Sequence, residues 1–261
     1  MKILQFTDPH LYGRADGKLR GVQTDATLRA VMLEAFDACP DYAAVMVSGD
    51  LVQDDPAGYI RFRNLFQRVE RPVLCVPGNH DIPQAMHAEL RGRPFQIGGV
   101  YQAEGWQLIM LDSYQAGSIG GRLSAQELAR LEQTLSGSRD HALLCLHHHP
   151  VPMRSRWLDG IGLANAEDFW SIVDAHRHVR AVVWGHVHQE FEGERSSGRN
   201  GRRDAVRLFA TPSTGAQFVP LSDEFAIDSR PPAYRQFELG PAGEIRSSLH
   251  WVQAPAARRV G

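Results

Sequence analysis

The chain has 261 residues, of which 43% are hydrophobic, and its formal net charge is −2 at pH 7. This length and composition suit one compact domain with a large core and leave little room for a second domain. A net charge so close to zero gives no field that would gather nucleic acid or an anionic membrane, so we expect neither as a partner and predict a small-molecule substrate.

The compartment can be predicted from the first residues and the cysteines. A strand-like run begins at Lys2, and the sequence contains no apolar stretch long enough for a signal peptide or a membrane span. The cysteines are Cys39, Cys75 and Cys145, and the last two lie within apolar runs. An odd number of such thiols fits a reducing compartment better than a disulfide framework. We therefore predict a cytoplasmic protein.

The first part of the chain alternates apolar runs with helical patterns, which predicts a βαβα order. The opening run ends at Phe6 and is followed by Asp8 and His10, whose side chains point the same way in extended backbone. Apolar residues then recur at helical spacing from Thr24 to Ala38. The next run, 42–47, ends in Ser48-Gly49-Asp50, and a second helical pattern follows.

A third run, 72–76, leads into a Pro-Gly turn followed by Asn79, His80 and Asp81. Ligands of α/β sheets bind outside the carboxyl ends of the strands, and glycine lets the backbone approach closely, so this turn is a candidate metal and phosphate site. Taken alone, the same residues are equally consistent with an ordinary turn.

Further apolar runs, at 106–111, 142–146 and 179–184, also end in polar residues. Helices are predicted between them, from Ser124, which has capping-box spacing to Glu127, and near 167–175. The triplet His147-His148-His149 follows the second of these runs, and His186 and His188 follow the third.

Beyond residue 188 the pattern changes to antiparallel strands. Runs at 189–194 and 205–210 flank Asn200-Gly201, a dipeptide typical of hairpin turns. We assign no chemistry to the arginines within 195–203, since a short Arg/Gly/Ser loop is usually solvated. Runs at 234–239 and 244–252 predict another strand pair. With no repeat or linker, residues 1–261 are predicted to form a single domain with a frayed tail at 254–261.

The side chains that follow the strand ends offer oxygen and imidazole donors without thiolate, a set that suits Mn, Fe or Zn. They are too many for one tetrahedral site, so they predict two ions that share a carboxylate. A lone histidine of this kind is more often structural than a ligand, but its recurrence at consecutive strand ends disfavours that interpretation. The candidate metal ligands are Asp8, His10, Asp50, Asn79, His148, His186 and His188.

Together these motifs resemble the signature set of the calcineurin-like metallophosphoesterases. The set comprises Asp8-Pro9-His10, Gly49-Asp50, Gly78-Asn79-His80-Asp81, His148-His149-Pro150 and Gly185-His186-Val187-His188. The resemblance implies an α/β fold of four layers, an α/β/β/α sandwich of two mixed β-sheets flanked by helices. It also implies two metal sites, one held by Asp8, His10, Asp50 and His188, the other by Asp50, Asn79, His148 and His186, with Asp50 as the bridge.

Several roles near the metals follow from the same resemblance. The family's ligand commonly stands two residues before a proline, which selects His148. We then take His147 as structural and His149 as a residue that either supports a ligand from behind or faces the substrate. His80 resembles the family's phosphate-contacting histidine, a catalytic group that is not a ligand. Two divalent ions, less two carboxylates and a bridging hydroxide, leave about +1 in the pocket, which attracts a phosphodiester anion.

Within the family, the chain is most similar to the bacterial class III 3′,5′-cyclic nucleotide phosphodiesterases, on segments 19–24, 157–159, 165–166, 210–214 and 217–218. It departs from them in the longer Arg-rich hairpin after His188. The similarity implies hydrolysis of 3′,5′-cyclic AMP to 5′-AMP, which lowers cellular cyclic AMP, with Fe and/or Mn as the metals and Zn as an alternative.

Two other functions stay open. One is a broader phosphodiesterase that acts on glycerophosphodiesters, 2′,3′-cyclic nucleotides or aryl phosphodiesters. The other is a scaffold without activity, which the filled ligand positions disfavour.

Substrate recognition is assigned to polar groups around the metals. Asn165 is the leading candidate because its amide offers both a donor and an acceptor, although it is equally suited to cap the helix near Glu167. Asn79, His80 and His149 are also expected to contact substrate. Thr214 is a further candidate, within a segment, 211–214, that is as consistent with a turn as with a pocket wall.

Overall fold

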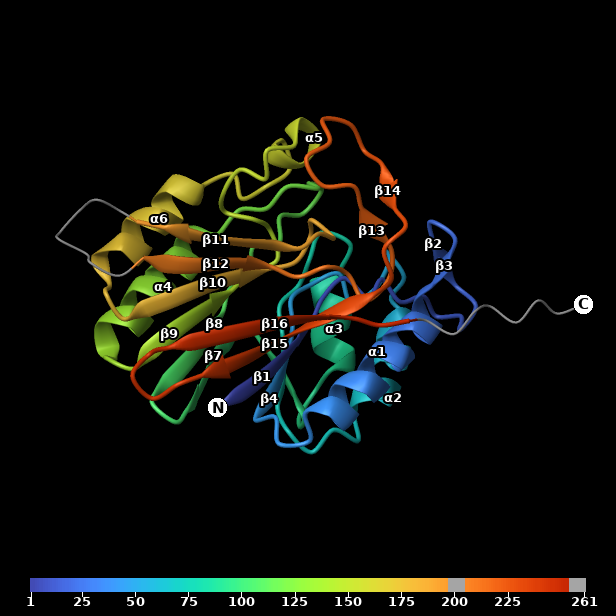
Figure 1. The fold of residues 1–261 in the computed structure, drawn as a ribbon, viewed down its shortest axis with the longest axis horizontal. Helices are drawn as coiled ribbons and strands as arrows, with labels where there is room; N and C mark the ends of the chain where they lie inside the picture. Colours follow the sequence, from blue (N-terminus) through green and yellow to red (C-terminus); the bar gives the residue numbers. More distant parts are fainter. Residues whose placement is uncertain (197–204, 254–261) are drawn as a thin grey trace, which may run out of the picture.

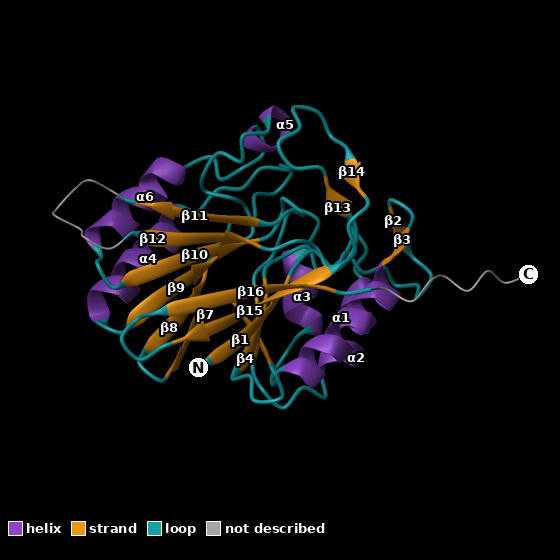
Figure 2. Cartoon of the chain, in the orientation of Figure 1, coloured by secondary structure: helices purple, strands orange, loops and turns teal. Residues whose placement is uncertain are grey.

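The structure, a computed structural model, describes residues 1–196 and 205–253. Two six-stranded sheets face each other, and helices cover their outer sides, which confirms the predicted four-layer sandwich (Figures 1 and 2). Among the described residues, no helix has both the length and the apolar character that crossing a membrane requires. The Asn200-Gly201 turn and the tail at 254–261 lie outside the described residues.

The first sheet has the order β16-β15-β1-β4-β5-β6. Its central strands β1, β4, β5 and β6 are parallel, and β15 and β16 form an antiparallel edge. The strands are β1 (Lys2–Phe6), β4 (Ala44–Val47), β5 (Val73–Cys75), β6 (Phe95–Ile97), β15 (Ala233–Leu239) and β16 (Ile245–Trp251).

The second sheet has the order β11-β12-β10-β9-β8-β7, with β12, β10, β9 and β8 parallel and β11 and β7 antiparallel at the edges. Pairing of β11 with β12 confirms the predicted hairpin strands. The strands are β7 (Gly99–Ala103), β8 (Trp106–Met110), β9 (His141–Cys145), β10 (Val179–Trp184), β11 (Phe191–Arg195) and β12 (Val206–Ala210).

The helices α1 (Thr24–Ala38), α2 (Gly58–Phe66) and α3 (Pro83–Glu89) accompany the first sheet, and α4 (Ala125–Gly137), α5 (Arg156–Asp159) and α6 (Ala166–Ala175) accompany the second (Figure 1). The predicted cap of α4 is confirmed, since the Ser124 hydroxyl accepts a hydrogen bond from the Glu127 amide. Two small hairpins complete the fold, β2 (Lys18–Leu19) with β3 (Val22–Gln23) and β13 (Gln217–Phe218) with β14 (Ile227–Asp228).

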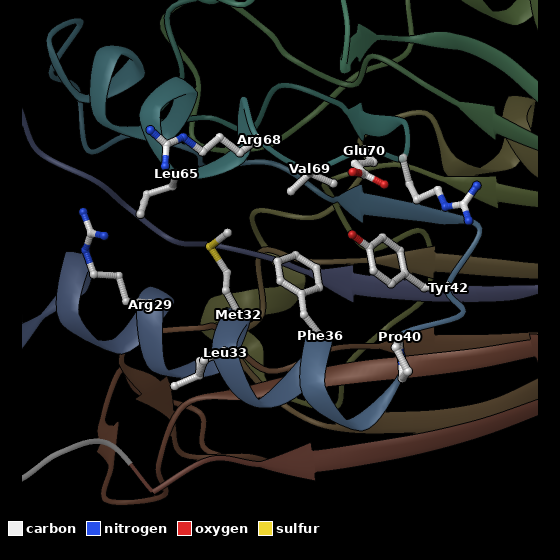
Figure 3. A pocket seen from close by; sticks show the side chains of 11 residues that line it. Arg29, Met32, Leu33, Phe36, Pro40, Tyr42, Leu65, Arg68, Val69 and Glu70 are labelled. Atoms are coloured by element: carbon white, nitrogen blue, oxygen red, sulfur yellow. The ribbon is translucent and has the colours of Figure 1, made fainter.

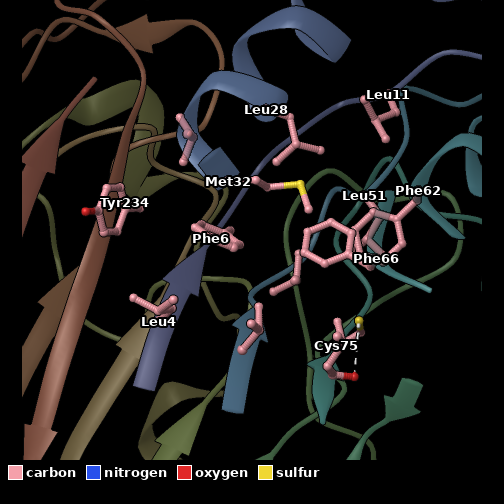
Figure 4. Packing of buried hydrophobic residues seen from close by; sticks show 14 of the residues in the cluster. Leu4, Phe6, Leu11, Leu28, Met32, Leu51, Phe62, Phe66, Cys75 and Tyr234 are labelled. Atoms are coloured by element: carbon pink, nitrogen blue, oxygen red, sulfur yellow. Dashed lines mark hydrogen bonds between the residues drawn. The ribbon is translucent and has the colours of Figure 1, made fainter. Parts of the chain in front are cut away.

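Both faces of the central strands are buried, which explains their continuous apolar runs. On β4, Val45 and Val47 pack under the helices of the first sheet, whereas Ala44 and Met46 pack between the two sheets. Figure 4 shows the outer cluster, in which Phe6, Phe62 and Phe66 lie close together beneath α1. Burial of each such side chain contributes about 1.5–3 kcal/mol to folding.

The carboxyl ends of the parallel strands of both sheets meet at one edge of the sandwich. The loops there lie so close that glycine is required: a side chain at Gly49 would collide with the His147 ring, and one at Gly185 with the Thr7 hydroxyl. The fold therefore brings together loops from residues 7 to 188 of the sequence, the loops that carry the predicted ligands.

Candidate metal centre

The loops at this edge have an unusual backbone. Five of the predicted ligands have positive φ angles, namely Asp8 at 51°, His10 at 44°, Asp50 at 50°, His186 at 66° and His188 at 48°. Residues with a Cβ seldom adopt this conformation, and such strain collects at functional sites. Backbone hydrogen bonds between the loops hold it in place, from Asp8 N to Gly49 O at 3.1 Å and from His10 N to Asp50 O at 2.9 Å.

The first group of donors contains Asp8, His10 and His188, all buried. His188 Nδ1 lies 2.7 Å from the Ala216 carbonyl. Because a carbonyl only accepts, Nδ1 must carry the proton, and Nε2 keeps its lone pair. Nε2 lies 3.1 Å from His10 Nε2 and 3.3 Å from Asp8 Oδ1. This arrangement fits a cation between the three side chains, as predicted from the sequence.

Asp50 lies between this group and a second one. Its Oδ2 is 3.6 Å from His10 Nε2 and 3.4 Å from His147 Nε2. His147 Nε2 is also 3.2 Å from Asn79 Oδ1, and its ring centroid is 5.0 Å from that of His186. The His186 amide donates to both oxygens of Asp8, and its Nε2 is buried without a partner. The predicted bridging position of Asp50 is therefore consistent with the geometry.

The histidines of the triplet differ in their hydrogen-bond partners. His147 Nδ1 lies 2.8 Å from the Ser48 carbonyl, so it is the proton-bearing nitrogen and Nε2 is the one that faces Asp50 and Asn79. His148 Nε2 must donate to the Ile119 carbonyl at 3.1 Å, and its Nδ1 accepts from the Ser113 hydroxyl at 2.8 Å. Both nitrogens of His148 thus have protein partners, yet its ring also lies with His147 and His186 in a group that could hold a metal ion. The choice of His148 as ligand stays a prediction, and His147 is a further candidate.

The charges at the centre explain why the pKa of His147 is raised. Burial by itself would lower the pKa of the imidazole, but the Asp50 carboxylate outweighs burial and raises the pKa to about 9. Burial likewise opposes ionisation of Asp50, and His147 and His10 nevertheless hold the pKa of Asp50 well below its usual value. A proton on His147 thus balances the carboxylates, and a divalent ion can take the place of that proton.

Two predicted recognition residues, Asn165 and His149, differ in their surroundings. The Asn165 amide is buried and bonds the backbone of Leu123 through both ends, accepting from its N–H and donating to its carbonyl at 3.0 Å each. Its side chain makes no capping hydrogen bond to α6 either. His149 lines a different cavity of about 460 Å³ beside Asp159 and Gly162. The Asn165 amide is thus engaged by Leu123, whereas the His149 ring stacks on that of His186 with centroids 5.8 Å apart. Substrate contact by either residue stays a prediction.

The segment 211–214 packs against the loop that carries Asp8. Ser213 Oγ donates to the Asp8 carbonyl at 2.7 Å, and the Thr214 amide donates to the Thr7 carbonyl at 3.0 Å. Thr214 itself is fully buried. The segment therefore supports the loop that carries Asp8 rather than forming a pocket wall.

His80 lies at the edge of the centre, where the sequence places it. Its amide donates to Asp50 Oδ1 at 2.8 Å, and its Nδ1 is 2.9 Å from Asp54 Oδ2. The side chain is one-third exposed, so it can meet a ligand. Sequence analysis missed Asp54, although the carboxylate run at 54–55, shortly after Gly49-Asp50, was a signal for it.

Asp81 is a second residue whose role was missed. Its buried carboxylate accepts hydrogen bonds from the amides of Leu51, Val52 and Gly78 and from the Tyr59 hydroxyl at 2.8 Å. It therefore fastens the loop of Asp50 to the loop of Asn79. Burial together with the neighbouring Asp50 raises the pKa of Asp81 to about 7.

The centre opens into a cavity of about 400 Å³, a size suited to a small molecule. A larger hollow of about 680 Å³ lies on α1, but its described lining holds one acidic residue, Glu70, and no histidine (Figure 3). The smaller cavity is therefore the candidate active site. Its lining residues are His10, Leu19, Arg20, Asp50, Gln53, Asn79, His80, Ile119, Trp157, Ile161, His186, His188, Phe218 and Phe225.

Comparison with known protein families gives one matching family, described as calcineurin-like phosphoesterase, over residues 1–190. Among characterised proteins, the chain is 38% identical over 254 residues to the 3′,5′-cyclic adenosine monophosphate phosphodiesterase CpdA of Vibrio vulnificus, covering 95% of this chain and 89% of that one. It is 35% identical over 253 residues to CpdA of Escherichia coli K12, covering 96% and 89%.

Solved structures with low sequence identity share the fold. A dimetal phosphatase from Danio rerio matches with a TM-score of 0.59 at 17% identity, over 97% of this chain and 99% of that chain. The purple acid phosphatase PPD1 of yellow lupin matches with a TM-score of 0.63 at 12% identity, over 90% of this chain and 48% of that one.

The choice between His147 and His148 as ligand can be tested by metal analysis. We propose that His147 binds metal and His148 does not, so His147→Ala should lower the bound metal per chain by about one ion, while His148→Gln should leave it unchanged. The measurement is elemental analysis of both purified variants beside the wild type. Loss of metal from His148→Gln alone would contradict the assignment.

Proposed function

Because this chain belongs to the calcineurin-like phosphoesterase family, we propose that it is a metal-dependent phosphodiesterase that hydrolyses 3′,5′-cyclic AMP to 5′-AMP and so lowers cellular cyclic AMP. The observation that carries this proposal is the similarity to CpdA proteins over nearly the whole length of both chains. A cytoplasmic setting remains a prediction from the sequence.

The side chains that would hold two ions fall into two sets that share Asp50. Asp8, His10 and His188 complete one set, and Asn79, His147 and His186 complete the other, supported by the contacts of 3.1–3.6 Å within and between them. Their nitrogen and oxygen donors suit Fe or Mn, with Zn as an alternative. When bound, two such ions activate a water molecule for attack and neutralise charge on the phosphate.

The residues of the chain supply orientation and a proton. Hydrolysis forms a bond from a water oxygen to phosphorus and breaks the bond from phosphorus to the 3′ oxygen, which must gain a proton as it leaves. His80 lines the cavity, and Asp54 holds its Nδ1, so Nε2 is the nitrogen available to donate that proton. The same N–H is placed to stabilise charge on the phosphate.

The remaining question is the range of diesters. A phosphoesterase centre of this kind also suits glycerophosphodiesters, 2′,3′-cyclic nucleotides and aryl phosphodiesters. The cavity of about 400 Å³ is large enough for a small molecule of any of these classes. Only a comparison of substrates on one preparation separates the proposed function from this broader one.

We expect the metal-loaded protein to hydrolyse 3′,5′-cyclic AMP with a higher kcat/KM than 2′,3′-cyclic AMP or glycerophosphoethanolamine, and to release 5′-AMP as the product. Chromatography of the reaction products checks both points. Release of 3′-AMP, or a higher kcat/KM for glycerophosphoethanolamine, would instead support the broader phosphodiesterase.

The role of His80 predicts a specific kinetic defect. His80→Ala should keep its metal and lose about 10²- to 10⁴-fold in kcat, because a proton donor in the transition state is removed. Asp54→Asn should lose less, since it only orients the ring. His87→Ala, an exposed histidine on α3, serves as the control and should behave as the wild type. A His80→Ala variant that has lost metal would place His80 among the ligands.

A further inference from the structure

The cavity at the metal centre also has an aromatic wall. Trp157, Phe218 and Phe225, here called the aromatic cluster, line it and meet one another edge to face. Their ring centroids are 5.6 Å apart for Trp157 and Phe218, 5.3 Å for Trp157 and Phe225, and 5.0 Å for Phe218 and Phe225. The Arg20 guanidinium lies 4.9 Å from the centroid of Phe225.

The aromatic cluster begins directly at the metal centre. Phe218 stacks flat on the imidazole of His188, with centroids 4.1 Å apart and the planes inclined by 8°. The predicted ligand His188 and the rings of Phe218 and Phe225 therefore line one continuous cavity. A ligand whose phosphate is held at the metals would extend its other end toward these rings.

The outer part of this wall exposes apolar surface. Phe225 is 42% exposed and Ile119, also in the cavity lining, is 61% exposed. Such surface in a cavity beside charged groups marks a binding site more often than a chance exposure.

The loop that carries Phe225 does not depend on that ring for its attachment. The Ser155 hydroxyl donates to the Ser222 carbonyl, and the Arg156 amide donates to Asp223 Oδ1 at 3.2 Å. Removal of the Phe225 ring should therefore leave the loop in place.

We propose that the aromatic cluster, together with Arg20, binds the nucleobase of the substrate, an inference that rests on the proposed function. A base offers a flat face that stacks on aromatic side chains. The Arg20 guanidinium, which lies over the Phe225 ring, can donate hydrogen bonds to the ring nitrogens of a purine. The phosphate end is then bound by charge at the metals and the base end by stacking. The aromatic cluster thereby supplies the selectivity for nucleotides over diesters without a ring.

The test uses ligands that differ only in the base. Calorimetry on the metal-loaded protein should show tighter binding of 5′-AMP than of ribose 5-phosphate. Phe225→Ala should weaken 5′-AMP binding about tenfold or more, as for loss of a base-stacking ring, and leave the Kd of ribose 5-phosphate unchanged. Phe225→Tyr should restore binding of 5′-AMP. Leu221→Ala removes another exposed apolar residue of the same loop and should change neither Kd.

Other outcomes overturn the inference or the proposed function separately. The inference fails if Phe225→Ala weakens both ligands equally or neither, or if Leu221→Ala has the same effect as Phe225→Ala. It also fails if the wild type binds both ligands equally. If the wild type prefers 5′-AMP and responds as expected to the variants, yet does not hydrolyse cyclic AMP, the base site stands and the proposed function fails.

Discussion

Two buried carboxylates, Asp8 and Asp50, lie among histidine side chains where the two sheets meet, and the rest of the site depends on balancing this charge. Buried carboxylates are costly unless they are paired or coordinate metal. Without metal, histidines partly compensate them, which is why Asp50 raises the pKa of His147 against the effect of burial. The same charges make the site a strong one for divalent cations.

Hydrogen bonds from the surrounding loops hold this arrangement in place. Carbonyls of Ser48 and Ala216 accept hydrogen bonds from Nδ1 of His147 and His188, so each imidazole turns Nε2 toward the centre. The Asp81 carboxylate joins the loops of Asp50 and Asn79, and Ser213 supports the loop of Asp8. These contacts hold the positive φ angles of the ligand loops and leave the cavity side to His80 and the aromatic rings.

The sequence predicts well what depends on local periodicity. The helix from Thr24 to Ala38, the parallel strands and the loops after them follow from patterns within short windows, so the edge where ligands gather could be predicted. The choice between His147 and His148 as ligand could not be predicted from the sequence. It depends on which ring contacts Ser113 and Ile119, about 30 residues away in sequence. The hydrogen bonds of Asn165 could not be predicted for the same reason, since its partner Leu123 lies on another loop. Phe225 meets Trp157 only in the folded chain.

The central claim is that a shared carboxylate holds two ions and that both are needed to cleave a cyclic phosphodiester. The most direct measurement is to remove all metal from the protein and to follow hydrolysis of 3′,5′-cyclic AMP as Mn²⁺ is added back in known equivalents. The account predicts no turnover without metal and a rate that reaches its maximum at two bound ions per chain. Full turnover in the metal-free protein, or a maximum at one ion, would contradict it.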